Sequence, residues 1–261
     1  MSEKIIKKAI ITSGGLATRM MPFSRVVPKA LVPLYVHIND KKNVVPIIDI
    51  IIKKLGDAGV IDYCIVTGGL HENVLKGHLG DSYNYIRQEK ALGFGDAVLK
   101  GKSFAGSDPI YVHADDGVIT GDLYNIGVSL FFEKNADAVL FLRKVENPKK
   151  SGIANVSNIF RYNDFDVYTI DDIVEKPNDP KGNFGATASY IFSNKIFEFI
   201  ESAGKSSNTG EIELTEGIRK LIHNNGKVYG IMLKDSDKWL NIGDPDSYYK
   251  TMDYTFKNKI L

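Results

Sequence analysis

The chain has 261 residues, of which 43% are hydrophobic and 25% are charged, and its net charge at pH 7 is +1. This size and composition suit one globular domain with a sizeable core. The near-neutral charge gives no sign of a nucleic-acid partner, and no apolar run approaches the roughly 20 residues that a membrane-spanning helix needs.

The N-terminus and the cysteine content both indicate a compartment. Met1 to Lys4 contains charge but is followed by no long apolar region or cleavage site, so we expect no signal peptide. Cys64 is the single cysteine and lies in an apolar run, so it is expected in the core without a disulfide partner. We therefore expect a cytoplasmic protein.

The first predicted strand ends at a pair of glycines. Its apolar run begins at Ala9, Gly14 and Gly15 follow, and the next loop contains Arg19 and Lys29. Glycine lets the backbone approach a ligand closely, so that its N–H groups can face an anion. Arginine adds a rigid fork for phosphate oxygens and lysine adds a movable point charge. The loop is predicted to bind a polyphosphate, although either cation could instead pair with a surface carboxylate.

Strands and helices alternate over the first half of the chain. Residues 35–43, which are polar and mixed, are expected to form a surface excursion. The periodicity and turn residues predict strands at 61–67, 83–87, 110–113 and 136–142, and helices at 46–58, 71–78, 96–103 and 123–134. This order predicts a Rossmann-like three-layer α/β/α fold with a mixed sheet. In such folds ligands bind beyond the carboxyl ends of the strands, where the loops at Gly14, Gln88 and Asp115 are expected.

The pattern changes from about Val145, where polar turns separate shorter apolar pieces. We expect strands at 153–156, 167–170, 173–175, 188–192 and 227–233, and helices at 194–202, around 214–222 and from about 245 onward. These pieces favour hairpins rather than regular crossovers. The second half is therefore expected to add a smaller mixed subregion to the same domain.

Three further groups are candidates for chemistry. Asp115 and Asp116 follow a strand, Glu175 and Lys176 end another, and Gln88 ends a third. Each group also has an ordinary explanation when it is taken alone. An Asp-Gly pair is common in turns, and a Glu-Lys pair or a glutamine at a strand end can simply face solvent.

Together the motifs resemble those of a known family. The stretch from Gly14 to Pro22, with the stretch from Pro28 to Pro33, resembles the signature of the sugar-1-phosphate nucleotidyltransferases. The chain looks most like the UTP–glucose-1-phosphate uridylyltransferase (UDP-glucose pyrophosphorylase) branch, and the likeness runs from about Lys8 to about Tyr249.

The resemblance implies roles for the nucleotide half. Arg19 and Lys29 would be catalytic, because they would hold the triphosphate and stabilise the departing pyrophosphate. Gln88 would contact the edge of a pyrimidine base. The nucleotide-binding residues implied are Gly14, Gly15, Leu16, Gln88 and Gly93.

The resemblance also implies a sugar-phosphate half and a metal. Lys176 would be catalytic and bind the sugar phosphate, while Gly152 and Glu175 would contact sugar hydroxyls. Asp115 would hold Mg²⁺, with Asn241 as a second candidate ligand. The single domain over 1–261 would then comprise a nucleotide-binding part at about 1–145 and a sugar-phosphate-binding part with the C-terminal helix at about 146–261.

The sequence departs from the family pattern at informative positions. Ala17 stands where the signature usually has glycine, and Asn241 stands where many relatives have an aspartate. Asp96 stands where a histidine is common among the uridylyltransferases. Asp244 and Asp246 could replace Asn241 as ligands, but their position is more typical of caps on the last helix.

The resemblance implies transfer of a uridylyl group from UTP to glucose 1-phosphate, which gives UDP-glucose and pyrophosphate with Mg²⁺ as cofactor. The same chemistry with dTTP or another sugar 1-phosphate is the first alternative. A catalytically silent nucleotide-binding regulatory subunit is the second, and only Ala17 and Asn241 favour it. The expected partners are small-molecule substrates and further copies of the chain in a homodimer or homotetramer, with no nucleic acid and no membrane. The aromatic face of the C-terminal helix could take part in such contacts or simply cover the core.

Overall fold

A computed structural model describes residues 4–69, 71–206 and 209–261. The first three residues of the charged N-terminal stretch therefore lie outside the described part. Within that part, no helix combines the length and apolarity needed to cross a membrane.

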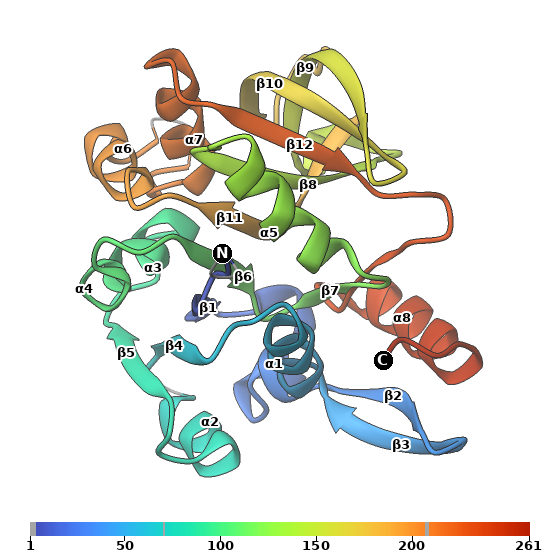
Figure 1. The fold of residues 1–261 in the computed structure, drawn as a ribbon. Helices are drawn as coiled ribbons and strands as arrows, with labels where there is room; N and C mark the ends of the chain where they lie inside the picture. Colours follow the sequence, from blue (N-terminus) through green and yellow to red (C-terminus); the bar gives the residue numbers. More distant parts are fainter. Residues whose placement is uncertain (1–3, 70, 207–208) are drawn as a thin grey trace.

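The centre of the molecule is a mixed sheet, which has nine strands in the described residues (Figure 1). In spatial order they are β5 (Asn84–Gln88), β4 (Asp62–Gly68), β1 (Lys8–Ser13), β6 (Ile110–Ala114), β11 (Phe184–Phe192), β8 (Ala138–Lys144), β12 (Val228–Met232), β10 (Phe165–Glu175) and β9 (Gly152–Tyr162). The strands β5, β4, β1 and β6 are parallel to one another, so their carboxyl ends share one edge of the sheet.

Helices cover both faces of this sheet, which confirms the predicted three-layer α/β/α fold. One face packs against α1 (Ile47–Asp57), α2 (Glu72–Leu79) and α5 (Leu123–Glu133). The other packs against α3 (Phe94–Lys100), α4 (Lys102–Ala105), α6 (Ile196–Ala203) and α7 (Leu214–His223). In β1 the fully buried Ile10 and Ile11 belong to opposite faces, which explains why this strand is a continuous apolar run.

The surface excursion expected at 35–43 lies mostly at the surface, and it forms most of a hairpin whose strand pairing was not predicted. Its strands are β2 (Pro33–Ile38) and β3 (Lys41–Pro46). Asn39 and Asp40 form the two-residue turn with φ of 50° and 60°, the left-handed pair that suits a tight hairpin. Leu34 and Val36 are buried in alternation with the partly exposed residues of β2, a pattern that the polar residues around the turn obscured.

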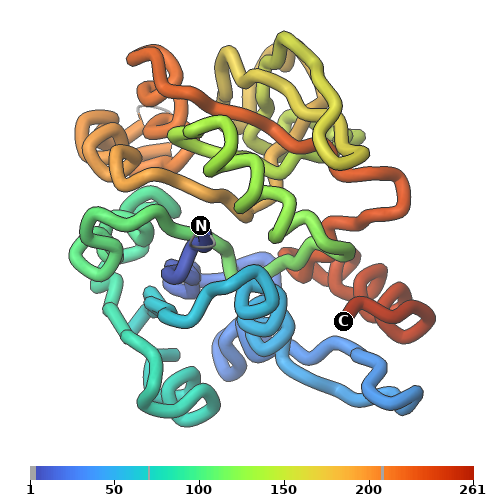
Figure 2. The backbone as a smooth tube through the Cα atoms, viewed as in Figure 1, coloured from blue at the N-terminus to red at the C-terminus, as the bar shows by residue number. Residues whose placement is uncertain are grey.

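The C-terminal helix α8 (Pro245–Lys257) returns to this hairpin (Figure 2). The backbone N–H of Tyr35 donates to the hydroxyl of Thr255 at 3.3 Å, and the rings of Tyr35 and Phe256 meet edge to face. Tyr248, Met252 and Tyr254 pack against the core, whereas Tyr249 stays 73% exposed. The aromatic face of α8 therefore mainly covers the core, as one of the two expectations had it.

The two strands expected at 167–170 and 173–175 are one strand, β10. Its pairing with β9 shifts register between Ile170 and Asp172. A bulge of this kind interrupts the two-residue alternation, which made one strand look like two.

The second half of the chain adds strands to the same sheet. The second part of β11, Ser189–Phe192, pairs with β6. Near the start of β11, Gly185 lies opposite Ile153 of β9. The start of β9 therefore lies beyond the carboxyl end of β6. This topology brings Gly152 and Glu175, which pair with each other, close to the edge where Asp115 follows β6.

Candidate active site

The glycine loop lies against Gln88. A Cβ atom at Gly14 would lie 2.4 Å from Oε1 of Gln88, so only glycine fits beneath this side chain. Gly15 and Leu16 follow on the surface, where Leu16 is 65% exposed. The loop thus exposes backbone and an apolar side chain to a ligand while Gln88, 5% exposed, forms part of the wall behind it.

Ala17 adopts the left-handed conformation, with φ 46° and ψ 43°. The hydroxyl of Ser24 donates to the carbonyl of Ala17 at 2.9 Å, and Nε2 of His71 donates to the carbonyl of Ser24 at 3.0 Å. These contacts hold the loop in a conformation that is unfavourable for alanine. They explain how an alanine is tolerated at a position where the family signature has glycine.

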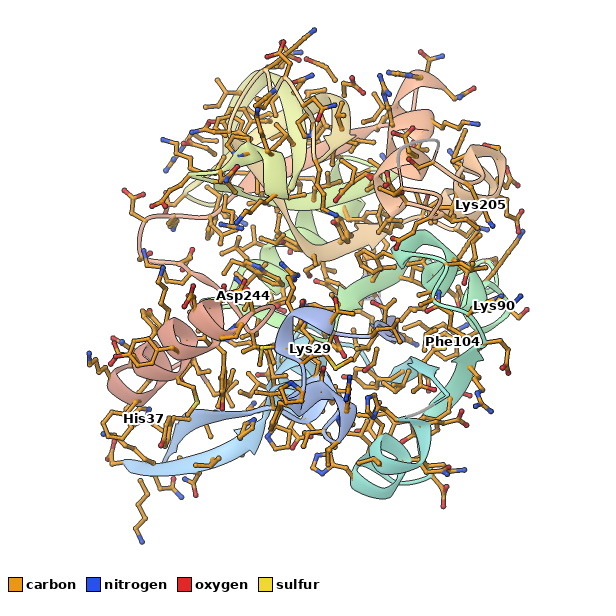
Figure 3. All side chains as sticks on the ribbon, turned by 180° about the vertical axis from the view of Figure 1, so that it is seen from behind. Lys29, His37, Lys90, Phe104, Lys205 and Asp244 are labelled. Carbon is orange, nitrogen blue, oxygen red and sulfur yellow. The ribbon has the colours of Figure 1, made fainter. Side chains whose placement is uncertain are left out.

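The two cationic side chains of the glycine loop, Lys29 and Arg19, have different neighbours. The ammonium of Lys29 contacts the carboxylate of Asp116. Arg19 has no ion pair in the part of the chain that the structure describes, and its guanidinium lies 3.4 Å from the position of a Cβ atom at Gly243. Figure 3 marks Lys29 on the glycine loop and Asp244 at the start of α8, the element that Arg19 approaches.

Asp244 caps α8, as the sequence predicted. Its Oδ1 accepts from the backbone N–H of Ser247 at 2.9 Å. This hydrogen bond, with smaller contributions from the Ser247 hydroxyl, Arg19 and Lys150, holds the pKa of Asp244 below its usual value. The carboxylate is thus committed to the helix, which argues against Asp244 as the replacement for Asn241.

Asp115 follows β6 and is half-buried at the sheet edge. Its Oδ2 accepts from the hydroxyl of Ser13 at 2.5 Å, and its backbone N–H donates to the carbonyl of Thr12 at 3.2 Å. Burial raises the pKa of Asp115 to about 6, although nearby Lys29 opposes this shift. A half-buried carboxylate that has no ion pair of its own is well suited to a positively charged ligand.

A buried polar network lies behind Asp115. Nδ1 of His113 donates to the carbonyl of Ala114 at 2.6 Å, and Nε2 is 3.0 Å from the hydroxyl of Tyr124. The Tyr124 hydroxyl accepts from the backbone N–H of Ile119, so its own hydrogen is free to go to His113. The network fixes the end of β6 and keeps His113 neutral, because burial lowers the pKa of His113 to about 4.

Asn241 ends β13 (Trp239–Asn241), which pairs with β7 (Gly117–Ile119) so that Asn241 lies opposite Gly117. A Cβ atom at Gly243 would lie 3.5 Å from Oδ1 of Asn241 and 3.7 Å from Oδ2 of Asp116. The amide and the carboxylate are therefore neighbours. No group of three or more His, Cys, Asp or Glu side chains that could hold a metal occurs within the described residues.

A cavity of about 410 Å³ lies at this edge. Its lining includes the sequence-predicted Gly14, Gly15, Leu16, Gln88, Gly93 and Asp115, and also Asp116, Phe94 and Glu211. Gly93 begins α3 with φ 111°, and a Cβ atom there would lie 2.6 Å from the carbonyl oxygen of Ile212. Glycine is therefore required at position 93 by both its conformation and its neighbour.

A second cavity of about 250 Å³ adjoins the first. Its lining includes Glu175, Lys176 and Tyr190, and it shares Phe94 and Glu211 with the larger cavity. The shared residues show that the two cavities lie on either side of one wall.

The side chains of the second cavity interact with one another. Nζ of Lys176 is 3.3 Å from Oε1 of Glu175, and a Cβ atom at Gly152 would lie 3.1 Å from Oε2 of Glu175. Burial raises the pKa of Glu175, and the neighbouring Lys176 partly opposes this shift. Gly152 thus leaves room for a half-buried carboxylate beside an exposed ammonium.

Sequence reasoning named Asp116 as a candidate but gave it no role, and it missed the two wall residues, Phe94 and Glu211. Asp116 was visible beside Asp115, but its contact with Lys29 depends on the fold. Phe94 stands between Gly93 and Gly95, and Glu211 begins the stretch that supports them, because the N–H of Gly95 donates to the carbonyl of Ile212 at 2.8 Å. The sequence around Glu211 does not reveal that this segment packs against Gly93 and Gly95.

The structure is thus an α/β fold with two adjoining cavities at the carboxyl edge of a mixed sheet. The profile of the nucleotidyl transferase family matches residues 8–258, and the chain belongs to that family.

Relatives named for two different activities are similar to this chain. A UTP–glucose-1-phosphate uridylyltransferase of Staphylococcus saprophyticus is 24% identical over 98% of this chain and 94% of its own length. A glucose-1-phosphate thymidylyltransferase of Neisseria meningitidis is 27% identical over 95% of this chain and 82% of its own length. The fold is shared with a crystal structure of UDP-glucose pyrophosphorylase complexed with UDP-glucose, at a TM-score of 0.82 and 24% identity, covering 97% of this chain and 99% of that one.

Proposed function

We propose that this nucleotidyltransferase transfers the uridylyl group of UTP to glucose 1-phosphate and releases pyrophosphate. The observation that supports this best is the pair of cavities with a common wall. One has the glycine loop and Asp115, and the other has Glu175 and Lys176. Such a pair suits two phosphate-bearing substrates that must meet at their phosphates.

In this proposal a phosphate oxygen of the sugar phosphate attacks the α-phosphorus of UTP in line. The new bond is from that oxygen to phosphorus, and the bond from phosphorus to the oxygen that bridges the α- and β-phosphates breaks. Pyrophosphate leaves with the electron pair. The nucleophile is already anionic at neutral pH, so no general base is needed, and catalysis consists of alignment and charge neutralisation.

The basic residues have distinct roles in this scheme. Lys176, whose side chain is 58% exposed, holds the sugar phosphate. Lys29 exchanges its contact with Asp116 for the polyphosphate, and Arg19 neutralises the leaving group. Gly14, Gly15, Leu16, Gln88 and Gly93 hold the nucleoside, and Gly152 and Glu175 hold the sugar.

The donor set fits a magnesium ion. Asp115, Asp116 and Asn241 offer oxygen atoms only, which Mg²⁺ prefers, and one or two protein carboxylates with substrate phosphates are enough for it. Asp115 and Asn241 would hold the ion, which would supply positive charge next to the α-phosphate. Burial raises the pKa of Asp115, and a bound cation would oppose that shift by stabilising the charged carboxylate.

The test is a pyrophosphate-release assay with UTP, glucose 1-phosphate and Mg²⁺. We expect Lys176→Ala to lower kcat/KM by about 10²–10³-fold, in the range found for the loss of one stabilising group. Lys181→Ala, on an exposed turn of the same part of the chain, is the control and is expected to keep the activity. A wild-type protein that binds UTP but releases no pyrophosphate with any sugar phosphate would contradict the proposal.

The second candidate uses dTTP in place of UTP. The thymidylyltransferase relative favours it, because uracil and thymine differ only by a methyl group remote from the N3–H edge. Comparing kcat/KM for UTP and dTTP in the same assay separates the two candidates.

A further inference from the structure

Gln88 has a side chain whose two amide hydrogens are both engaged inside the protein. Its Nε2 donates to Oδ2 of Asp96 at 2.7 Å and to the carbonyl oxygen of Gly93 at 3.2 Å. A carbonyl and a carboxylate oxygen can only accept, so the amide nitrogen must face these two partners. The orientation of the Gln88 amide is therefore fixed by the fold.

Asp96 is the stronger of the two partners. The residue is 5% exposed, and its contact with Gln88 is charge-assisted, shorter and better shielded than the bond to Gly93. Lys100, one turn later on α3, lies 3.7 Å from Oδ1 of Asp96 and leaves Oδ2 to Gln88. A buried carboxylate paired in this way resists reversal of the amide, because reversal would place two oxygens against each other.

With its nitrogen committed, Gln88 has one group left for a ligand, which is the acceptor Oε1. This oxygen lies over Gly14, and both residues line the larger cavity together with Gly93 and Phe94. The cavity wall therefore offers an acceptor at this position and cannot offer a donor from the same side chain.

We propose that Asp96 is a positioning residue that makes the base subsite selective for bases with an N–H donor at the edge facing Gln88. Uracil and thymine have a hydrogen on N3, whereas cytosine has a lone pair there. Cytosine would thus place acceptor against acceptor. The inference rests on the proposed function for the identity of the ligand, and it adds the reason why UTP and dTTP would be used while CTP is rejected.

The test compares UTP and CTP in the wild type and in Asp96→Asn. Asparagine is similar in size, removes the charge that attracts the Gln88 nitrogen and can also donate to Oε1 of a reversed Gln88. Only the weaker bond to the Gly93 carbonyl then favours the original orientation, so the Gln88 amide nitrogen can turn toward the cavity. We expect the ratio of kcat/KM for CTP to that for UTP to rise at least about tenfold, since a site built for one hydrogen-bond pattern rejects the other strongly. Dissociation constants for both nucleotides, measured by titration calorimetry, are expected to shift in the same direction.

Two controls separate positioning from a structural role. Lys100→Met removes the cation beside Asp96 but leaves the Asp96–Gln88 bond, and is expected to keep the CTP-to-UTP ratio. Near-ultraviolet circular dichroism of Asp96→Asn checks the fold. An equal loss of affinity for both nucleotides, with the ratio unchanged, would overturn the role of Asp96. Nucleotide binding with the expected ratios but no pyrophosphate release would instead contradict the proposed function and leave the inference about the base standing.

Discussion

Ala17 has a backbone conformation that is unfavourable for alanine. The left-handed region is unfavourable for L-residues other than glycine by roughly 1–2 kcal/mol, and Ala17 lies there with φ 46°. Glycine would relieve that strain, but it would also make the unfolded chain more flexible, at about 0.4–1 kcal/mol. The strain is the larger effect but is partly offset by the second, so the net cost of alanine is small, which helps to explain why both residues are compatible with this loop.

We therefore expect Ala17→Gly to raise the free energy of unfolding by up to about 1 kcal/mol. Ala17→Val should lower it, because a β-branched residue is a poor fit to positive φ. Urea denaturation of the three proteins measures both changes. A glycine variant less stable than the wild type by more than the error of the fits would show that the alanine conformation is not strained.

His113 should make stability depend on pH. Burial lowers the pKa of His113 in the folded protein to about 4 from an ordinary value of 6.5. The unfolded chain therefore binds the extra proton first, so this contribution to stability is complete above pH 6.5 and is lost as the pH falls toward 4. The difference of about 2.5 pKa units corresponds to about 3 kcal/mol.

The measurement is the free energy of unfolding of the wild type and of His113→Gln between pH 7 and pH 4. Asp115 titrates in the opposite sense over part of this range, so the difference between the two proteins is the informative quantity. We expect the advantage of the wild type to shrink as the pH falls. A constant difference would mean that His113 is protonated in the folded protein at the same pH as in the unfolded chain.

At the scale of elements, α8 and the β2–β3 hairpin stabilise each other. The hydroxyl of Thr255 is fully buried, accepts from the N–H of Tyr35 and donates to the carbonyl of Met252. Thr255→Val keeps the shape but leaves the N–H of Tyr35 without its partner. We expect a loss of about 1–3 kcal/mol in the free energy of unfolding.

The same substitution one turn earlier provides a comparison. The hydroxyl of Thr251 donates to the carbonyl of Asn241 at 2.7 Å. Thr251→Val should therefore raise the Mg²⁺ concentration needed for half-maximal activity, whereas Thr255→Val should leave that concentration unchanged. Equal magnesium dependence in both variants would argue that Asn241 is not a ligand.

The elements also show what sequence can and cannot reveal. Residues 47–57 repeat their apolar side chains at helical spacing, and the structure has α1 there because that face meets the sheet. The hairpin was missed because only one face of β2 is buried and its turn is polar. The register shift in β10 was equally invisible, since a bulge depends on the partner strand.

The candidate site likewise has residues that the sequence predicted and residues that it could not predict. Most of the glycines and strand-end residues that line the larger cavity were predicted, because each follows a recognisable strand. Phe94 and Glu211 could not be predicted, because they become a wall only when α3 packs against the segment before α7. The positions of Arg19 and Lys29 relative to their neighbours also depend on tertiary structure.

At the scale of the whole molecule, the wall shared by the two cavities predicts coupled effects. Phe94 lines both cavities, and its ring lies 6.1 Å from that of Tyr190. Phe94→Ala should weaken binding of UTP and of glucose 1-phosphate, each by about tenfold, or about 1.4 kcal/mol.

Single-cavity variants are the controls for this prediction. Gln88→Ala should weaken only the nucleotide, and Lys176→Ala should weaken only the sugar phosphate, as measured by titration calorimetry with each ligand alone. If Phe94→Ala affected one ligand only, the two cavities would be energetically separate.

The pairing of β11 with both β6 and β9 has a consequence for how this enzyme can diverge. The two cavities are attached to one continuous frame of backbone hydrogen bonds, and moving one relative to the other would require the strands between them to slip in register. The stretch from Gly210 to Glu213 is not part of that frame. If the proposed function holds, we expect new sugars to be accommodated during evolution by substitutions in this segment, while the spacing between the two cavities is inherited unchanged.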